Sequence, residues 1–201
     1  MRPADEALIV IDMQNDFCPG GALAVTGGDV IIPQINALMG QFGTVVLTQD
    51  WHPHDHSSFA DMHPGAAAFT QIDLPYGTQT LWPRHCVQGT VGAQFHNALQ
   101  TDRAQMVIRK GFRSAIDSYS ALFENDHATP TGLHGYLTTR GIQRLTFVGL
   151  ALDYCVAWSA MDAAGLGFQV TVVQNACRAI DLGGSLALQQ AAMRAAGVVL
   201  G

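Results

Sequence analysis

Six short apolar runs, rich in β-branched residues, recur along the chain and are separated by longer stretches with a helical pattern. Each run is typical of a strand buried on both faces of a parallel sheet. The runs lie at residues 7–11, 44–48, 105–109, 145–150, 169–173 and 197–200. Strands that alternate with helices predict right-handed crossovers with helices on both faces of the sheet. The sequence therefore predicts a three-layer α/β/α fold around a six-stranded, mainly parallel sheet.

Three of the intervening stretches predict amphipathic helices, at residues 29–42, 153–166 and 185–196. The first of them tolerates Pro33 in its first turn. Ser185 is expected to cap the third helix at its N-terminus, and Gly197 to end it. No internal repeat or linker interrupts the pattern, and a chain of 201 residues fits a single core. We therefore expect one domain that spans residues 1–201.

Charge and N-terminal composition exclude several classes of partner. The net charge is −6 at pH 7 and no Lys/Arg cluster offsets it, so we expect no nucleic-acid partner. The apolar run near the N-terminus is too short for a signal peptide or a membrane anchor. The four cysteines are widely spaced, which favours reduced thiols, with two disulfides in a secreted protein as the alternative. We therefore expect a cytoplasmic protein that does not bind membranes.

The segment 51–90 departs from the alternating pattern. It holds four of the eight prolines and five of the eight histidines. Long loops within compact domains are usually functional, so this segment is expected to contribute to a site.

Reactive side chains follow four of the predicted strands. Asp12 follows the first strand, Asp50 and His52 the second, Lys110 the third, and Cys155 lies just past the fourth. Ligands of open parallel sheets bind outside the carboxyl ends of the strands. These side chains are therefore expected to meet at one edge of the sheet.

Cys155 is the candidate nucleophile. It lies in a turn between a strand and a helix, where the helix dipole favours the thiolate. Asp12 can accept the thiol proton, and Lys110 can stabilise the thiolate and hold the carboxylate in place. The backbone N–H groups of Ala151 and Cys155 are candidate donors to an oxyanion. The alternative interpretation of Cys155 is a small buried core residue.

A candidate metal site lies in the histidine-rich segment. Asp50 and His52 are two residues apart and can point to the same side of an extended chain, and His56 and His85 follow. Three imidazoles and a carboxylate suit Zn²⁺, Fe²⁺ or Mn²⁺, and we expect one divalent ion, Zn²⁺ first. His54 is expected to face solvent instead.

Several segments resemble the isochorismatase-like cysteine hydrolases, and within them the nicotinamidases, over nearly the whole chain. The matching segments, in order, are residues 12–23 (DMQNDFCPGGAL), 48–56 (TQDWHPHDH), 82–86 (WPRHC), 110–111 (KG), 117–120 (DSYS) and 149–156 (GLALDYCV). Many relatives keep the Asp, Lys and Cys but lack the metal ligands. Because this chain keeps both sets, the resemblance favours the nicotinamidases.

The resemblance implies a strand order of 3-2-1-4-5-6 and a cis peptide between Leu150 and Ala151. It implies a catalytic triad of Asp12, Lys110 and Cys155, with the Ala151 and Cys155 amides as the oxyanion hole. The implied metal ligands are Asp50, His52, His85 and, as a further direct ligand, His56. The implied substrate-binding residues are Phe17 and Trp82 on either side of an aromatic ring, with Leu23, Tyr119 and Leu150.

The function implied by the resemblance is hydrolysis of nicotinamide to nicotinate and ammonia through a Cys155 thioester, in NAD salvage, with pyrazinamide also accepted. A monomer or homodimer is expected. Three alternatives stay open at this point. The chain could cleave another small amide or an enol ether, it could be a non-catalytic metal-binding protein, or a metal-bound hydroxide could attack while Cys155 is idle.

Overall fold

The computed structural model describes residues 2–201 and contains a six-stranded sheet in which all neighbouring strands are parallel. The strand order is β5-β2-β1-β6-β7-β8. Counted within the sheet along the chain, this is the order 3-2-1-4-5-6, so the predicted fold is confirmed. The sheet strands are β1 (Glu6–Ile11), β2 (Thr44–Asp50), β5 (Met106–Lys110), β6 (Arg144–Leu150), β7 (Gln169–Arg178) and β8 (Val199–Leu200).

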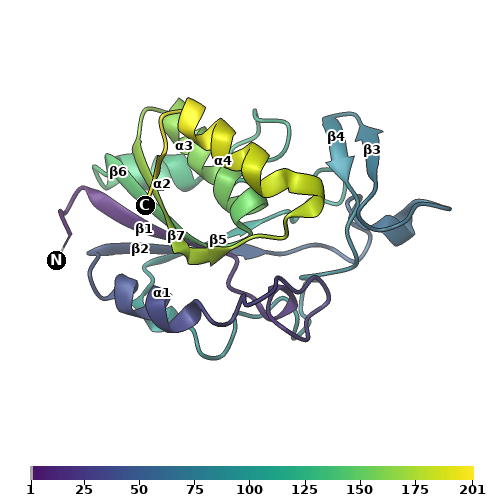
Figure 1. Cartoon of the computed structure of the whole chain (residues 1–201), viewed down its shortest axis with the longest axis horizontal. Helices are drawn as coiled ribbons and strands as arrows, with labels where there is room; N and C mark the ends of the chain where they lie inside the picture. Colours follow the sequence, from purple (N-terminus) through teal and green to yellow (C-terminus); the bar gives the residue numbers. More distant parts are fainter. Residues whose placement is uncertain (1) are drawn as a thin grey trace.

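Helices cover both faces of the sheet. Helix α1 lies below the sheet in Figure 1, and α2, α3 and α4 lie above it. Their bounds are α1 (Ile32–Met39), α2 (Leu133–Thr139), α3 (Ala157–Gly165) and α4 (Ser185–Ala195). No helix within residues 2–201 is both long and apolar enough to cross a bilayer.

The first two strands lie in the core. Every residue of β1 and β2 is buried, as their apolar runs Ala7–Ile11 and Val45–Leu47 predict, and the buried polar residues Gln49 and Asp50 stand at the carboxyl end of β2. Strand β5 at the sheet edge alternates between half-buried and exposed residues until its last residue, Lys110, which is buried. The carboxyl end of this edge strand, where Lys110 lies, is therefore more buried than the rest of the strand.

Some elements differ from the sequence-based prediction. Strand β7 runs to Arg178, five residues beyond the predicted end, after a register shift opposite Phe147 and Gly149. The short helix α2 and the antiparallel hairpin of β3 (Gln71–Leu74) and β4 (Gly77–Thr80) were not predicted. The hairpin belongs to the proline-rich segment and stands beyond the end of the main sheet (Figure 1).

Two helix starts also differ from the prediction. The predicted helix 153–166 begins as a π-helical turn, η4 (Leu152–Val156), that leads into α3. Ser185 is the first residue of α4 and does not cap it, because Gly184 occupies the N-cap position in a left-handed conformation. Gly197 has a positive φ of 83° just after α4, as predicted for a residue that ends a helix.

Gly149 permits a close approach between β6 and β1 next to the catalytic edge. Its φ is +114°, and a Cβ atom at this position would lie 2.2 Å from the backbone oxygen of Ile11. A side chain here would therefore push β6 away from the residue that precedes Asp12.

We predict that Gly149→Ala lowers the free energy of unfolding by about 3 kcal/mol, because strained backbone and overlap with β1 add together. Gly141→Ala is the matched control, since Gly141 also has a positive φ but no atom lies within 4 Å of its Cβ position. The control is expected to cost about 1 kcal/mol. Urea denaturation measures both values, and equal losses would contradict the close-approach explanation.

Candidate active site

The reactive side chains meet at the carboxyl edge of the sheet, as the strand-end rule predicts. Asp12 directly follows β1, while Asp50 and Lys110 are the last residues of β2 and β5 and are paired in register. Cys155 lies in the η4 turn after β6. One oxygen of Asp12, one of Asp50 and the Cys155 sulfur lie within 4.8 Å of one another.

Lys110 is the only lysine in the chain, and it occupies the centre of this cluster. Its Nζ lies 2.8 Å from Asp12 Oδ2 and 3.4 Å from Cys155 Sγ, and it also contacts Asp50 Oδ1. Nζ donates a further hydrogen bond of 2.9 Å to the Ser118 carbonyl. The ammonium therefore bridges two carboxylates and the candidate nucleophile.

The charges of this cluster stabilise one another. Burial alone would lower the pKa of Lys110, but Asp12 and Asp50 outweigh it and hold this pKa well above its usual range. Burial alone would raise the pKa of Asp50, but Lys110 together with His52 and His85 outweighs it and holds that pKa well below its usual range. Lys110 is therefore an ammonium and Asp50 a carboxylate at neutral pH.

Asp12 is held in an uncommon backbone conformation with one oxygen left available. Its φ is +47°, in the left-handed region that few residues other than glycine adopt. Thr48 Oγ1 donates a 2.6 Å hydrogen bond to Asp12 Oδ1 and accepts a 3.1 Å bond from the Asp12 amide. Oδ2 has the Lys110 ion contact but no hydrogen bond of good geometry in the described residues. Burial raises the pKa of Asp12 to about 6, opposed by Lys110.

Cys155 differs from the sequence-based expectation in its resting protonation state. The thiol is buried, and burial raises its pKa well above the usual range, although Lys110 acts in the opposite direction. The expected thiolate-favouring effect of the helix start is therefore outweighed by desolvation. The resting group is a thiol, and a base is needed to activate it.

The turn before Cys155 presents a free backbone donor. The peptide between Leu150 and Ala151 is cis, as the family resemblance implies. The Ala151 amide donates no hydrogen bond to another residue within 2–201, while the Ala151 carbonyl accepts from Tyr154 and Val156. The N–H group of Ala151 is therefore available to a ligand in the pocket.

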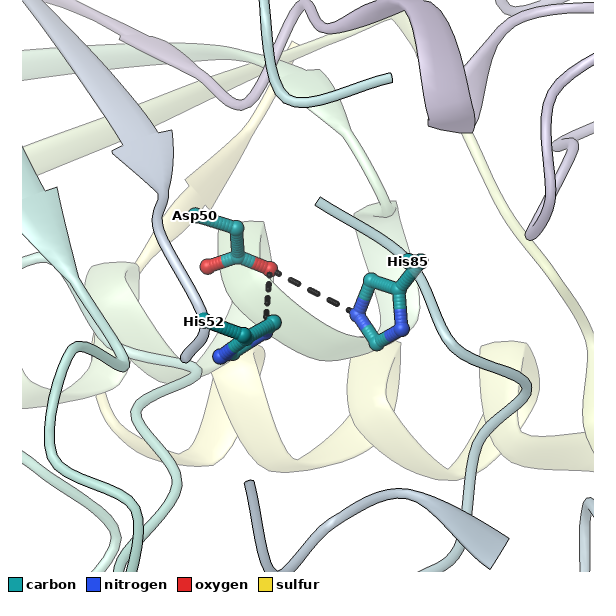
Figure 2. A group of neighbouring side chains, drawn as sticks. All are labelled: Asp50, His52 and His85. Atoms are coloured by element: carbon teal, nitrogen blue, oxygen red, sulfur yellow. Dashed lines mark ion pairs between the residues drawn. The ribbon is translucent and has the colours of Figure 1, made fainter. Parts of the chain in front are cut away.

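Asp50, His52 and His85 form a candidate metal centre (Figure 2). Asp50 Oδ2 lies 3.5 Å from His52 Nε2 and 3.9 Å from His85 Nε2. The Nδ1 atoms face the Gly111 and Pro83 carbonyls, each at 2.8 Å. In each ring, Nδ1–H donates to a backbone carbonyl. Nε2 therefore carries no proton, and its lone pair points toward the Asp50 oxygen. The donor set therefore fits a divalent transition-metal ion.

The electrostatics of the two rings are set by burial and by Asp50. Burial, followed by the nearby His52, lowers the pKa of His85 to about 4, so this ring is neutral at neutral pH. Burial would also lower the pKa of His52, but its contact with Asp50 raises it. Gly111 makes room for His52, because a Cβ atom there would lie 2.4 Å from His52 Cε1.

His56 is not brought together with Asp50 and His85. Its Nδ1 lies 2.7 Å from Ser58 Oγ and its Nε2 lies 3.1 Å from the Ile116 carbonyl, so both nitrogens are engaged. Its ring packs against His52, with 4.2 Å between the centroids. The structure therefore groups His56 with His52 and Asp117, and not with Asp50 and His85. His54 is exposed, as expected.

A narrow cavity connects the thiol, the metal centre and an aromatic wall. Four of the five residues expected to bind substrate line it. Residues of the nucleophile turn and of the candidate metal centre line it as well. The lining residues are Phe17, Leu23, Asp50, Trp82, His85, Asp117, Tyr119, Ala151, Tyr154, Cys155 and Ile180. Leu150 is the exception, because its side chain is fully buried in the core and does not line the cavity.

Three lining residues were given no role from the sequence. Tyr154 packs edge-on against Trp82, with 4.9 Å between centroids, and its place beside Cys155 was a usable signal. Asp117 lies in the matched DSYS segment and places an oxygen within 4.8 Å of ring nitrogens of His52 and His56. Ile180 carries no sequence signal, because the extended end of β7 and the loop after it bring it to the pocket.

The proteins similar to this chain include curated and solved nicotinamidases. The curated nicotinamidase of Acinetobacter baylyi is 56% identical over 192 residues, which cover 96% of this chain and 90% of that protein. The solved Acinetobacter baumannii nicotinamidase/pyrazinamidase has a TM-score of 0.98 at 55% identity and covers 100% of this chain and 97% of its own. The Pyrococcus horikoshii pyrazinamidase, solved in complex with zinc, has a TM-score of 0.80 at 35% identity, with 98% of both chains covered.

The Isochorismatase domain model matches residues 6–200. This match covers all of the sheet and every residue of the site at its carboxyl edge. The chain therefore belongs to the isochorismatase family and is a hydrolase of that family.

Proposed function

We propose that the chain hydrolyses nicotinamide to nicotinate and ammonia. The observation that carries this proposal is one cavity that holds the Cys155 thiol, the Asp50–His85 edge of the candidate metal centre and the Phe17 and Trp82 side chains. An aromatic ring with a carboxamide fits such a cavity, with the ring between aromatic walls and the amide at the thiol. The activity named for the A. baylyi relative supports this substrate.

In the first step Asp12 takes the proton of Cys155, and the sulfur attacks the carboxamide carbon. Oδ2 of Asp12, which contacts Lys110 but accepts no hydrogen bond in the described residues, is the oxygen suited to receive this proton. Lys110 stabilises both the carboxylate before transfer and the sulfur anion during attack. The Ala151 N–H, with that of Cys155, donates to the oxyanion that forms as the carbonyl π bond opens.

In the second step the C–N bond breaks, the nitrogen takes the proton held by Asp12, and ammonia leaves. The remaining intermediate is a nicotinoyl thioester on Cys155. Asp12, again a carboxylate, then removes a proton from an attacking water as a new C–O bond forms. Breaking the C–S bond transfers the proton held by Asp12 to sulfur and releases nicotinic acid, which loses its proton to water or to ammonia and becomes nicotinate.

We propose Asp50, His52 and His85 as the ligands of one divalent ion, with His56 supporting His52. Zinc is the first candidate, which the zinc complex of the P. horikoshii relative supports. When bound, such an ion supplies Lewis acidity and a coordination position for the ring nitrogen. Pyrazinamide has a nitrogen at the same ring position, so we also propose it as a substrate. The product nicotinate is consistent with a role in NAD salvage.

We predict that the purified protein releases ammonia from nicotinamide, and that chelation followed by dialysis abolishes this turnover. Turnover is lost because the substrate ring is not held without the ion. Restoring Zn²⁺, Fe²⁺ or Mn²⁺ is therefore expected to recover it. A coupled ammonia assay measures the rate in each state. No turnover with metal restored would contradict the substrate, and turnover insensitive to the chelator would contradict the role of the metal.

We predict that Cys155→Ala reduces kcat by about 10³-fold or more, because no thioester forms. Cys177→Ala is the matched control, since Cys177 is also a buried thiol but lines no part of the cavity. Its activity is expected to stay within about twofold of the wild type. Full activity of Cys155→Ala would instead support attack by a metal-bound hydroxide.

We predict that His85→Ala lowers the affinity for the divalent ion by more than about 100-fold, whereas His56→Gln lowers it by about tenfold or less. The reason is that His85 offers a free Nε2 to the Asp50 cluster, while both nitrogens of His56 are engaged elsewhere. Metal content after equilibrium dialysis measures both effects. Equal losses would make His56 a direct ligand.

A further inference from the structure

Asp153 is a buried carboxyl group two residues before Cys155 that the reaction does not use. It is 1% exposed and forms no ion pair with a cationic side chain in residues 2–201. A buried carboxyl group without a cation is costly unless hydrogen bonds satisfy its oxygens. The hydrogen bonds that Asp153 accepts therefore indicate its structural role.

Three donors converge on the Asp153 carboxyl group, two from the loop after β7 and one from the first residue of α4. Oδ1 accepts the Ile180 amide at 3.0 Å, and Oδ2 accepts the Asp181 amide at 2.8 Å and the Ser185 hydroxyl at 2.5 Å. All three partners are donors, so both side-chain positions of residue 153 must be hydrogen-bond acceptors, as the two oxygens of a carboxylate are. An asparagine would direct its NH₂ group toward at least one of these donors.

The loop that Asp153 holds forms one wall of the catalytic cavity. Ile180 lines this cavity together with Cys155. Asp181 is left-handed with a φ of 55°, and its own Oδ1 accepts the Leu186 amide in the first turn of α4. One carboxyl group on the nucleophile turn thus fixes both the pocket wall and the start of α4.

We propose that Asp153 is a positioning residue that sets the distance between the Ile180 wall and the Cys155 thiol, and so the fit of the substrate ring. This inference rests on the proposed amide hydrolysis. Wall contacts are made to the ring both in the bound substrate and in the transition state. Weakening them should therefore raise KM more than it lowers kcat.

The test compares Asp153→Asn with Asp126→Asn. Asp126 accepts donors of the same kinds, two backbone amides (Ala128 and Thr129) and one hydroxyl (Thr129). It does not line the cavity, and it lies outside the turn that holds Cys155. Asp153→Asn is expected to raise KM for nicotinamide by about tenfold with kcat within about threefold, and Asp126→Asn to change neither beyond about twofold. Hydrogen exchange of the Ile180 and Asp181 amides should accelerate only in Asp153→Asn.

A milder pair keeps the proposal testable if Asp153→Asn does not fold. Ser185→Ala removes one of the three bonds, and Thr146→Val removes a comparable hydroxyl–carboxylate bond to Glu6 away from the site. KM should rise about threefold in Ser185→Ala and stay unchanged in Thr146→Val.

Two outcomes would overturn the proposal. One is an unchanged KM in both Asp153→Asn and Ser185→Ala, and the other is unchanged exchange of the two amides. A wild-type protein without nicotinamide turnover would instead overturn the proposed substrate, and the exchange measurement would still decide whether Asp153 holds the loop.

Discussion

The buried ammonium of Lys110 is the interaction on which the rest of the site depends. It contacts both Asp12 and Asp50 and lies 3.4 Å from the Cys155 sulfur. Without this cation, two carboxylates at adjacent strand ends would repel each other in a medium that screens charge poorly. Parallel pairing of β1, β2 and β5 brings the side chains of Asp12, Asp50 and Lys110 together, so the order of the strands determines the geometry of the site. The same ammonium therefore joins the hydrolytic group to the candidate metal centre.

The site remains rich in negative charge even with Lys110 present. Asp12, Asp50 and Asp117 are all buried, and Lys110 is the only buried ammonium in the described chain. A divalent cation held by Asp50, His52 and His85 would offset this excess, which supports the proposed metal independently of the relatives.

The high pKa of the Cys155 thiol and the Asp12 pKa of about 6 fit a general-base mechanism, because Asp12 is largely ionised at neutral pH while the thiol is not.

Much of the fold could be predicted because β1 and β2 contain the apolar runs Ala7–Ile11 and Val45–Leu47, and the strand-end rule then placed Asp12, Lys110 and Cys155. The hairpin β3–β4 escaped prediction because its strands are only four residues long and contain just two apolar residues, Ile72 and Leu74. Helix α2 escaped prediction because it contains Gly135 and two threonines. Residue spacing suggested His56 as a ligand, but which nitrogens are free depends on Ser58 and Ile116. The protonation state of Cys155 depends on burial, which no local pattern reveals. The single lysine was a sequence signal for the site.

The central claim is that Lys110 is a cation held between two carboxylates, and its uniqueness in the chain makes a direct measurement feasible. Protein labelled with ¹³C at lysine Cε gives one side-chain signal, which can be followed during a pH titration of chelator-treated protein. The account predicts that this signal keeps its ammonium shift beyond the usual lysine pKa of about 10.4. In Asp12→Asn the pKa should fall, since one of the two carboxylates is lost. A Lys110 pKa at or below the usual value in the wild type would contradict the account.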